Sequence, residues 1–400
     1  MMPYATFFNY RVPPADFLFS VVFALFFVSL AARQVVFKWH PFFYWLLFYF
    51  AALLLSAFFS RQPQMSFVKL AGESYLLTLP VIAFQIIDDT TRLKRAVYAY
   101  LAGTIVTVAV GLASIALFYI DRGNFILTYT LFHYGTLPPG NYPRLQATYL
   151  NANMLCNYLS VGFVLLLAAR RIDWIGRKTF FALFGGLVVC ALFTVSPGLG
   201  GIALAAGLWF RLFPFFEHRF SGRAALAAGS LAALLFVVAL AVAPNRHQTA
   251  PFEVRLPIVE TTVQPSSRAM AWIDAARNFA ADPLVGRGVG ETACRIHYFD
   301  LSNRMQILTD AHNTYLNVAA QAGVFGLLAI VAISVYPLRP LFTRRREIKS
   351  PTAILRVGLV IAFASAFVYQ GLGGSFENAR HLWVLLGLIL CAGKIDAEKI

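Results

Sequence analysis

Charged side chains are scarce in this chain. They make up 13% of its 400 residues, whereas 59% of the residues are hydrophobic and the mean hydropathy is +0.67. A water-soluble protein has about a quarter of its residues charged. The shortage excludes a soluble globular protein. It predicts a polytopic membrane protein in which residues 1–400 form a single transmembrane domain, because the bilayer itself covers the apolar surface.

Cysteine is rare as well. Three of the four cysteines, Cys156, Cys190 and Cys391, fall in or beside apolar segments, and only Cys294 lies in a long polar stretch. They show neither a disulfide pattern nor the spacing of metal ligands. We therefore expect no metal site and no cofactor in this protein.

Acidic residues are outnumbered by basic ones. The chain has 33 Lys and Arg against 18 Asp and Glu, a formal net charge of +15. Such an excess can indicate nucleic-acid binding, but these basic residues stand mostly in short runs between apolar segments, at 170–178, 211–223 and 339–349. That is the pattern of cytoplasmic loops under the positive-inside rule. The charge therefore indicates orientation in a membrane, and no nucleic-acid partner is expected.

Long apolar stretches are what the chain has in abundance. Stretches of roughly 17 to 25 residues, the length that crosses a bilayer, occur at 16–32, 41–59, 66–87, 95–120, 153–169, 179–195, 198–213, 223–243, 313–336, 353–370 and 378–393. The predicted fold is an all-α bundle of 11 to 12 transmembrane spans. A twelfth span would put both termini in the cytoplasm. Its candidate positions are residues 1–15, residues 125–134, and a 64–87 stretch divided into two elements.

Two longer polar stretches, 121–152 and 244–312, fall on the side opposite the basic loops. The second contains seven arginines and no lysine. We expect it to be a large helical periplasmic loop, a subdomain within the transmembrane domain. Within it, Ser266 and Ser267 are candidate N-caps of a short amphipathic helix at the membrane surface. One face of that helix is predicted from residues at steps of three and four, Arg268, Trp272, Ala275 and Phe279.

Three glycines follow this predicted helix, at Gly286, Gly288 and Gly290. A glycine run of this kind can form a phosphate-binding loop. It follows no predicted strand, however, and does not continue as G-x-G-x-x-G. We therefore favour a structural turn that brings the backbone close to a ligand or a helix end.

His312 stands at the mouth of the apolar stretch 313–336. A lone histidine in this position is more often an interfacial residue than a catalyst. Here Asp310 is close enough in sequence to orient the ring. The helix that follows carries small residues at helical spacing that allow close packing and would hold its own mouth in place, Ala319, Ala322, Gly323 and Gly326. A base beside arginines suits a sugar hydroxyl that attacks a carbon bearing a diphosphate.

Two further polar groups stand at span entrances on the same side. Arg144, with Asn151 and Asn153, precedes the 153–169 stretch, and its planar guanidinium suits a phosphate. These residues can equally cap a helix and meet lipid headgroups. Glu377 and Arg380 precede the last stretch, where they form either part of a site or an ion pair that closes the bundle.

These residues carry a resemblance to a known family. His312-Asn313, nine residues, then Gly323-Val-Phe-Gly326 resembles the H-[NSQ]-x9-G-x-x-G signature of the O-antigen ligase family, which are integral membrane glycosyltransferases. The other pieces resemble the family in order along the chain, namely Arg144 with Asn151 and Asn153, Arg268 with Trp272 as R-x-x-x-W, PLVGRGVG as P-x-x-G-x-G-x-G, and SFENARHLW. TVSPGLGG departs from it, because Pro197 stands where many members of the wider superfamily have an arginine.

The resemblance implies about twelve transmembrane helices in the bacterial inner membrane, with an active site that faces the periplasm. It implies transfer of O-antigen from undecaprenyl diphosphate to a sugar hydroxyl of the lipid A core, without metal or nucleotide. The expected partners are the carrier-linked glycan, the lipid A-core and membrane lipids. His312 would be the general base, with Arg144 and Arg268 on the diphosphate. The residues expected to bind or support substrate are Asn313, Asp310, Trp272, Asn151, Asn153, Glu377 and Arg380.

Other functions stay open at this point. An O-antigen polymerase and a protein O-oligosaccharyltransferase belong to the same superfamily, and Arg277 with Gly288 matches an R-x10-G spacing of such polymerases. The 121–152 stretch lacks a second copy of that spacing. A transporter is the alternative from another class, and it predicts internal repeats and ionisable residues at mid-membrane depth. The sequence shows no repeat, and it leaves the oligomeric state open.

Overall fold

A computed structural model describes residues 5–7, 10–12, 14–131, 143–213, 219–244, 254–256, 261–299, 305–342, 348, 350–374 and 379–397. Helices make up most of it. One helix lies at each predicted apolar stretch, and their bounds are α1 Pro14–Ala31, α2 Phe42–Phe58, α3 Pro63–Ile86, α4 Thr90–Ile120, α6 Ala152–Arg171, α7 Arg177–Phe193, α8 Leu199–Leu212, α9 Arg219–Ala241, α11 Thr314–Val335, α12 Pro351–Leu372 and α13 Arg380–Ala397. Long apolar runs form helices because a helix satisfies its own backbone groups without water.

Length and composition qualify only some of these helices as membrane spans. Among the described residues, five helices are long and apolar enough to cross a bilayer, at Pro63–Ile86, Thr90–Ile120, Ala152–Arg171, Thr314–Phe342 and Pro351–Leu372. Four more are apolar but shorter, at Asp16–Ala31, Phe42–Phe58, Leu199–Leu212 and Leu226–Leu235. The helical membrane fold therefore agrees with the prediction, whereas a count of 11 to 12 spans stays a prediction.

The three candidate positions for a twelfth span hold no further long helix in their described parts. The first residues form a hairpin of β1 Ala5–Phe7 and β2 Tyr10–Val12. A single turn, α5 Leu127–Thr130, lies in the second position. The division of 64–87 into two elements is wrong, because α3 runs through Pro80 as one helix.

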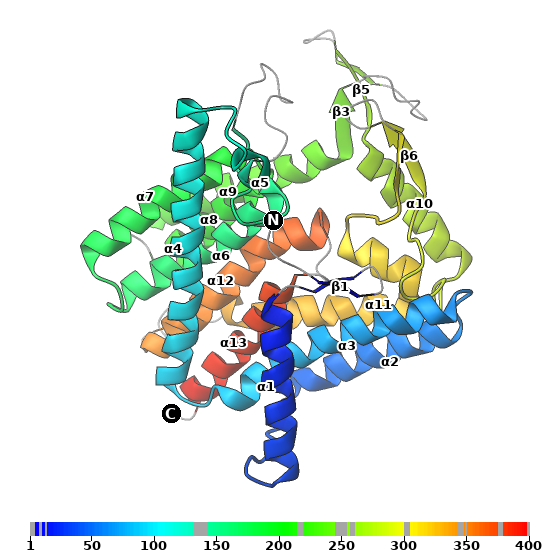
Figure 1. Ribbon diagram of the computed structural model, residues 1–400, viewed down its shortest axis with the longest axis horizontal. Coiled ribbons are helices and arrows are strands. Elements are labelled where there is room, and N and C mark those ends of the chain that lie inside the picture. The colour runs from blue at the N-terminus through cyan, green and yellow to red at the C-terminus, as the bar shows by residue number, and fades with distance from the viewer. Residues whose placement is uncertain are drawn as a thin grey trace.

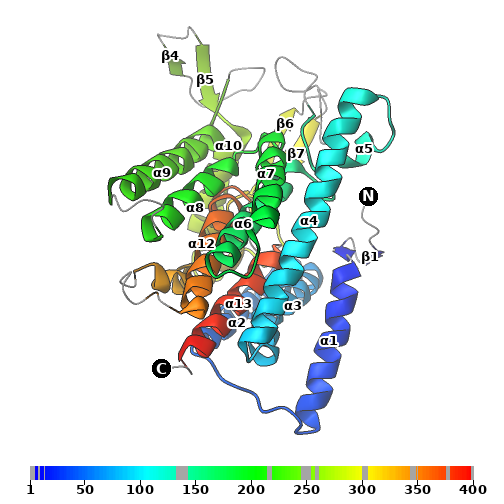
Figure 2. The same ribbon diagram turned by 90° about the vertical axis from the view of Figure 1, so that its left-hand side faces the viewer.

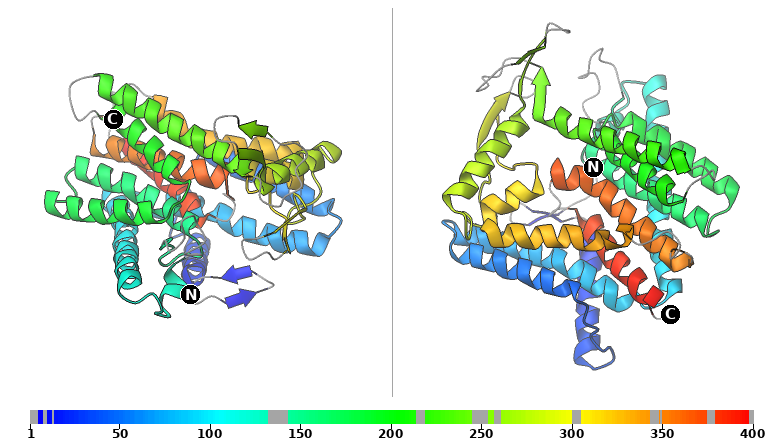
Figure 3. Two further views of the ribbon diagram at one scale, coloured as in Figure 1. Left: turned by 90° about the horizontal axis from the view of Figure 1, so that it is seen from above. Right: turned by 180° about the vertical axis from the view of Figure 1, so that it is seen from behind.

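The helices form two layers that meet at α12 and α13. In the first layer α11 packs on α2 and α2 on α3, and the three lie side by side (Figure 1, and from behind in Figure 3). In the second layer α6 contacts α7, α8 and α12, and α8 packs along α9. α4 runs along α6 and α7 (Figure 2). α13 contacts both α3 and α12 and so joins the layers.

The loop that was predicted to be helical contains strands as well as a helix. Its strands are β3 Val242–Pro244, β4 Val254–Leu256, β5 Thr261–Pro265, β6 Ile296–Phe299 and β7 Met305–Leu308. β3, β5 and β4 form one antiparallel sheet in that order, and β6 pairs with β7 as a second. Segments such as TTVQP and IHYF are rich in β-branched and aromatic residues, which favours strands.

The amphipathic helix predicted inside the loop is confirmed as α10 Ser267–Ala281. The Ser266 hydroxyl caps it by accepting a hydrogen bond from the Ala269 N–H at 3.2 Å. Its buried residues are Ala271, Ala275 and Asn278, and α10 packs on α11 and β6. Its place at the membrane surface stays a prediction.

The glycine run after α10 is a structural turn, as favoured from the sequence. α11 is interrupted at Gly323, whose φ of 63° and ψ of −160° are not helical. The turn supplies hydrogen bonds there. The Arg287 N–H donates to the Ala320 carbonyl at 3.0 Å, and the Gly288 N–H donates to the Gln321 carbonyl at 3.1 Å. The predicted apolar stretch 313–336 therefore forms α11 with a kink at Gly323, where the turn replaces part of the helix's own hydrogen bonding.

Candidate active site

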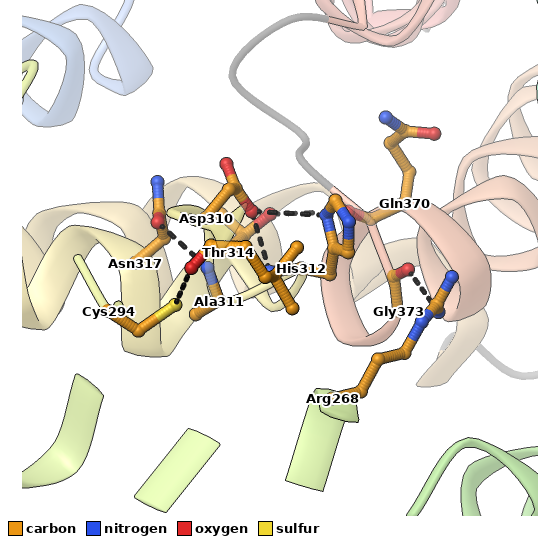
Figure 4. Close-up of polar contacts among 10 residues, drawn as sticks. Arg268, Cys294, Asp310, Ala311, His312, Thr314, Asn317, Gln370 and Gly373 are labelled. Carbon is orange, nitrogen blue, oxygen red and sulfur yellow. Dashed lines mark hydrogen bonds and ion pairs between the residues drawn. The ribbon is translucent and has the colours of Figure 1, made fainter. Parts of the chain in front are cut away.

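His312 and Asp310 are in direct contact, as their spacing predicted. The His312 N–H donates to Asp310 Oδ1 at 2.6 Å, and the ring atom Nδ1 lies 3.3 Å from the same oxygen (Figure 4). A ring held through Nδ1 presents Nε2 as the nitrogen that accepts a proton. The His312 side chain is 39% exposed, so a substrate can reach it.

The backbone at His312 is strained. Its φ is +47°, a left-handed conformation that non-glycine residues adopt only when the surroundings require it. Asp310 supplies one restraint on the side before it. On the other side the Asn313 Oδ1 caps α11, accepting from the Tyr315 N–H at 3.1 Å and the Leu316 N–H at 3.2 Å. Hydrogen bonds to the side chains of Asp310 and Asn313 thus fix the backbone on both sides of His312.

The Asp310 carboxyl is ionised in this setting. Burial by itself would raise its pKa, but the hydrogen bonds and charge of His312, together with the charge of Lys69, lower the pKa below its usual value. An ionised Asp310 orients the imidazole and stabilises the imidazolium that forms when Nε2 takes up a proton.

Arg268 reaches the same neighbourhood from the first turn of α10. Its Nη1 donates to the Gly373 carbonyl at 2.9 Å, just after α12 ends. Figure 4 shows Arg268 and His312 both beside this end of α12. Arg268 forms no ion pair with any described residue. A guanidinium has five N–H donors, so other donors remain for an anionic ligand.

Arg144 is placed by the end of α7 and the start of α6. Its Nε donates to the Thr194 carbonyl at 3.1 Å, and its Nη2 donates to Asn153 Oδ1 at 3.2 Å. Burial lowers the pKa of this guanidinium, and the nearby Tyr369 of α12 opposes that shift. Arginine keeps its charge under such conditions.

The C-terminal end of α12 is where these segments meet. Tyr369 acts on Arg144, the Gln370 carbonyl accepts from Thr314 Oγ1 at 3.2 Å, and the Gly373 carbonyl accepts from Arg268. Thr314 is the first residue of α11, two positions after His312. The structure therefore brings the segments that carry Arg144, Arg268 and His312 together at one end of one helix.

Arg144 also contacts the stretch where the sequence departs from the pattern that it otherwise resembles. The carbonyl it binds belongs to Thr194, in the TVSPGLGG stretch where Pro197 replaces an arginine. Val195 has a φ of 44°, so the backbone turns sharply there. The Arg144 guanidinium therefore contacts the stretch in which an arginine was expected.

The other predicted residues have structural partners. Asn151 Oδ1 caps α6 by accepting from the Met154 N–H at 2.9 Å. Trp272 packs on the small cluster around Ala271 and Ala275. Its Nε1 is buried, with no hydrogen-bond partner among the described residues.

Arg380 binds a residue outside this group. It forms a two-point ion pair with Asp16 of α1, with its Nε and Nη2 each 2.7 Å from a carboxylate oxygen. Asp16 also accepts from the Tyr75 hydroxyl at 2.8 Å. This is the geometry of an ion pair that closes the bundle. Glu377 lies outside the described residues.

Sequence reasoning missed a pair of charged residues in α3. Lys69 Nζ lies 2.8 Å from a Glu73 oxygen, and the Glu73 side chain is only 2% exposed. Lys69 is the cation that acts on Asp310 beside His312. A lysine four residues before a glutamate, inside the apolar stretch 66–87, is the signal that was available in the sequence.

The glycine turn is joined to α2 and α3 by Glu291. Its Oε1 accepts from Ser60 Oγ and from the Arg61 N–H, both at 2.8 Å. Its carbonyl accepts from Gln321 Nε2 at 2.6 Å. The loop, the kinked part of α11 and the α2–α3 turn are therefore connected by hydrogen bonds through one residue.

We expect Lys69→Met to destabilise the protein by about 3 kcal/mol, because it leaves the Glu73 charge buried without its partner. Adding Glu73→Gln should recover most of that loss, since the pair is then removed as a unit. Thermal unfolding of the purified protein in detergent measures both variants. Equal stability of the single variant and the wild type would contradict a buried, coupled pair.

A family model described as O-antigen ligase matches residues 176–331. The matched segment runs from the start of α7 past the kink in α11, so it includes Arg268, Asp310 and His312 but not Arg144 or Lys69. No curated protein matches the chain.

Proposed function

Because the chain belongs to the O-antigen ligase superfamily, whose members are multi-pass membrane proteins, we propose that it is an O-antigen ligase. It transfers a glycan from undecaprenyl diphosphate to a sugar hydroxyl of the lipid A core, on the periplasmic side of the inner membrane. The observation that carries this proposal is an imidazole oriented by Asp310, beside an arginine, at the end of α12.

His312 acts as the general base. Its Nε2 removes the proton from the acceptor hydroxyl while that oxygen attacks the anomeric carbon of the donor glycan. The bond from that carbon to the diphosphate oxygen breaks on the opposite face, so the configuration inverts. The diphosphate leaves with the bonding electron pair, and Asp310 stabilises the imidazolium until the proton is released.

Arg144 and Arg268 hold the diphosphate and stabilise the charge that develops on it. Both side chains are fixed by carbonyl oxygens, of Thr194 and Gly373 respectively, so little reorganisation is needed as the negative charge grows. Planar guanidiniums also match phosphate oxygens at two points. Asn153 supports Arg144 directly.

A reconstitution assay separates the ligase from its relatives. Purified protein in vesicles receives labelled undecaprenyl-diphosphate-linked glycan together with lipid A-core. A ligase moves the label onto the lipid A-core. A polymerase instead produces longer carrier-linked chains. A protein oligosaccharyltransferase leaves the lipid A-core unlabelled and moves the label onto a protein acceptor. Label that only crosses the vesicle membrane would indicate a transporter.

We expect Arg268→Lys to reduce the transfer rate by about 10²-fold, because a lysine ammonium cannot bind a phosphate at two points. Arg277→Lys is the matched control, since Arg277 lies on the same helix with an exposed side chain. Rates are compared at saturating donor in the same assay. Full activity of the Arg268 variant would remove the diphosphate role from this residue.

A further inference from the structure

A cavity lies at the end of α12 opposite the candidate active site. Its volume is about 680 Å³, within the range of small-ligand sites. Its walls come from the 38–40 segment before α2, the short helix η1 Tyr336–Phe342, and the first turns of α12 with the last turns of α13. Since Arg356 lines the cavity and Gln370 contacts the active-site segment, about 21 Å of α12 separates the two places.

Cations converge on this cavity from distant parts of the chain. Lys38, Arg339, Arg356 and Lys394 line it, and no described carboxylate does. The Arg356 Nε is buried and has no hydrogen-bond partner in the described part of the chain. Leaving a buried donor of a charged group without a partner is costly. The four cations and the buried Arg356 donor therefore favour an anion as the ligand of this cavity.

The cavity wall is fixed in position, which distinguishes it from an ordinary basic loop. The Gln85 side chain holds the backbone of Lys38 at both its N–H and its carbonyl, at 2.9 and 2.8 Å. Arg356 packs against Gly393, where an added Cβ would lie 3.0 Å from the Arg356 Cζ. The Arg339 guanidinium lies 4.2 Å from the ring centroid of Tyr336.

His40 also lines the cavity, and its ring is a hydrogen-bond donor there. Its Nδ1 accepts a hydrogen bond from the Phe42 N–H at 3.1 Å, so the ring is neutral with its proton on Nε2. Burial, and then the nearby charge of Arg356, lower the pKa of His40. The histidine therefore adds an N–H donor to the cavity.

The remaining wall is apolar. Phe84 of α3 and Ile389 and Leu390 of α13 line the same cavity as the cations. A phosphate with hydrocarbon attached to it matches such a lining better than a free ion does. We propose that this cavity is a binding site for a phosphate group, supplied by the headgroup of an anionic phospholipid or by soluble phosphate. It differs from the active site in place and in ligand.

The test measures saturable binding to purified full-length protein by thermal shift and native mass spectrometry. Three probes are compared, namely phosphatidylglycerol, phosphatidylcholine and inorganic phosphate. Binding of phosphatidylglycerol in preference to the other two supports a lipid headgroup, and saturable binding of inorganic phosphate supports the soluble source. Both supporting outcomes require that Arg356→Gln weakens binding about fivefold, the effect of removing one nearby cation.

Variants on the cavity rim and elsewhere complete the experiment. The double variant Lys38→Gln with Arg339→Gln changes two exposed residues, so it should fold even where Arg356→Gln does not. Its binding of the probe is expected to be about 25-fold weaker. Lys178→Gln is the control, because this exposed lysine at the start of α7 does not line the cavity. No saturable binding of any probe, or equal binding by wild type and the rim variant, would overturn the proposal.

Discussion

Replacing His312 with asparagine is expected to lower the rate of glycan transfer by about 10² to 10⁴-fold, the usual contribution of a general base. Asparagine is chosen because it tolerates a positive φ better than other residues, and His312 has a φ of +47°. The variant should therefore keep the start of α11 intact and lose only the imidazole. His312→Ala removes the ring as well but adds backbone strain.

The matched control for this prediction is His297→Asn. His297 lies on β6 of the same loop, with an exposed side chain that forms no part of the site. Transfer is measured with labelled donor and lipid A-core, at equal amounts of folded protein. A His312→Asn protein that transferred glycan as fast as the control would end the assignment of His312 as the base.

The second large effect is expected from Gly323→Ala. The φ of 63° and ψ of −160° at Gly323 belong to a region that only glycine populates. A Cβ there would lie 2.2 Å from the Leu284 carbonyl oxygen, and this neighbour is backbone that cannot rotate away. We expect a loss of about 4 kcal/mol or more in stability, together with the loss of transfer activity, because the glycine turn separates from α11.

Gly72→Ala is the control for this substitution. An added Cβ at Gly72, inside α3, meets nothing within 4 Å, and alanine favours a helix over glycine by roughly 1 kcal/mol. The Gly72 variant should be as stable as the wild type or more stable. Thermal unfolding measures both variants, and a Gly323→Ala protein with an unchanged midpoint would show that the kink does not depend on glycine.

The two expected results separate the chemical step from the structure that supports it. His312 carries the chemistry, and Gly323 permits the turn that holds it. The Gly288 N–H bonds to α11 at the kink, and Glu291 connects that turn to Ser60 of the α2–α3 connection. A defect at Gly323 should therefore reduce activity and stability together, whereas His312→Asn should reduce activity alone.

Local sequence features predicted the helices well. Each apolar stretch became a helix, and Ser266 capped α10 as expected. They also predicted the contact of Asp310 with His312, which are two residues apart. The strands of the 244–312 loop were missed, because their segments are only three to five residues long and strand formation depends strongly on the surrounding structure.

The order of residues along the chain was enough to predict a helical membrane protein and to single out Arg144, Arg268 and His312. Hydropathy and motif spacing are properties of neighbouring residues, so they can be found without a fold. The three-dimensional arrangement was needed to find that Lys69 acts on Asp310, that Arg380 pairs with Asp16, and that α12 joins the arginines to the histidine. Those contacts connect residues far apart along the chain, and charge and hydrogen bonding act over a few ångströms in space, whatever the separation in sequence.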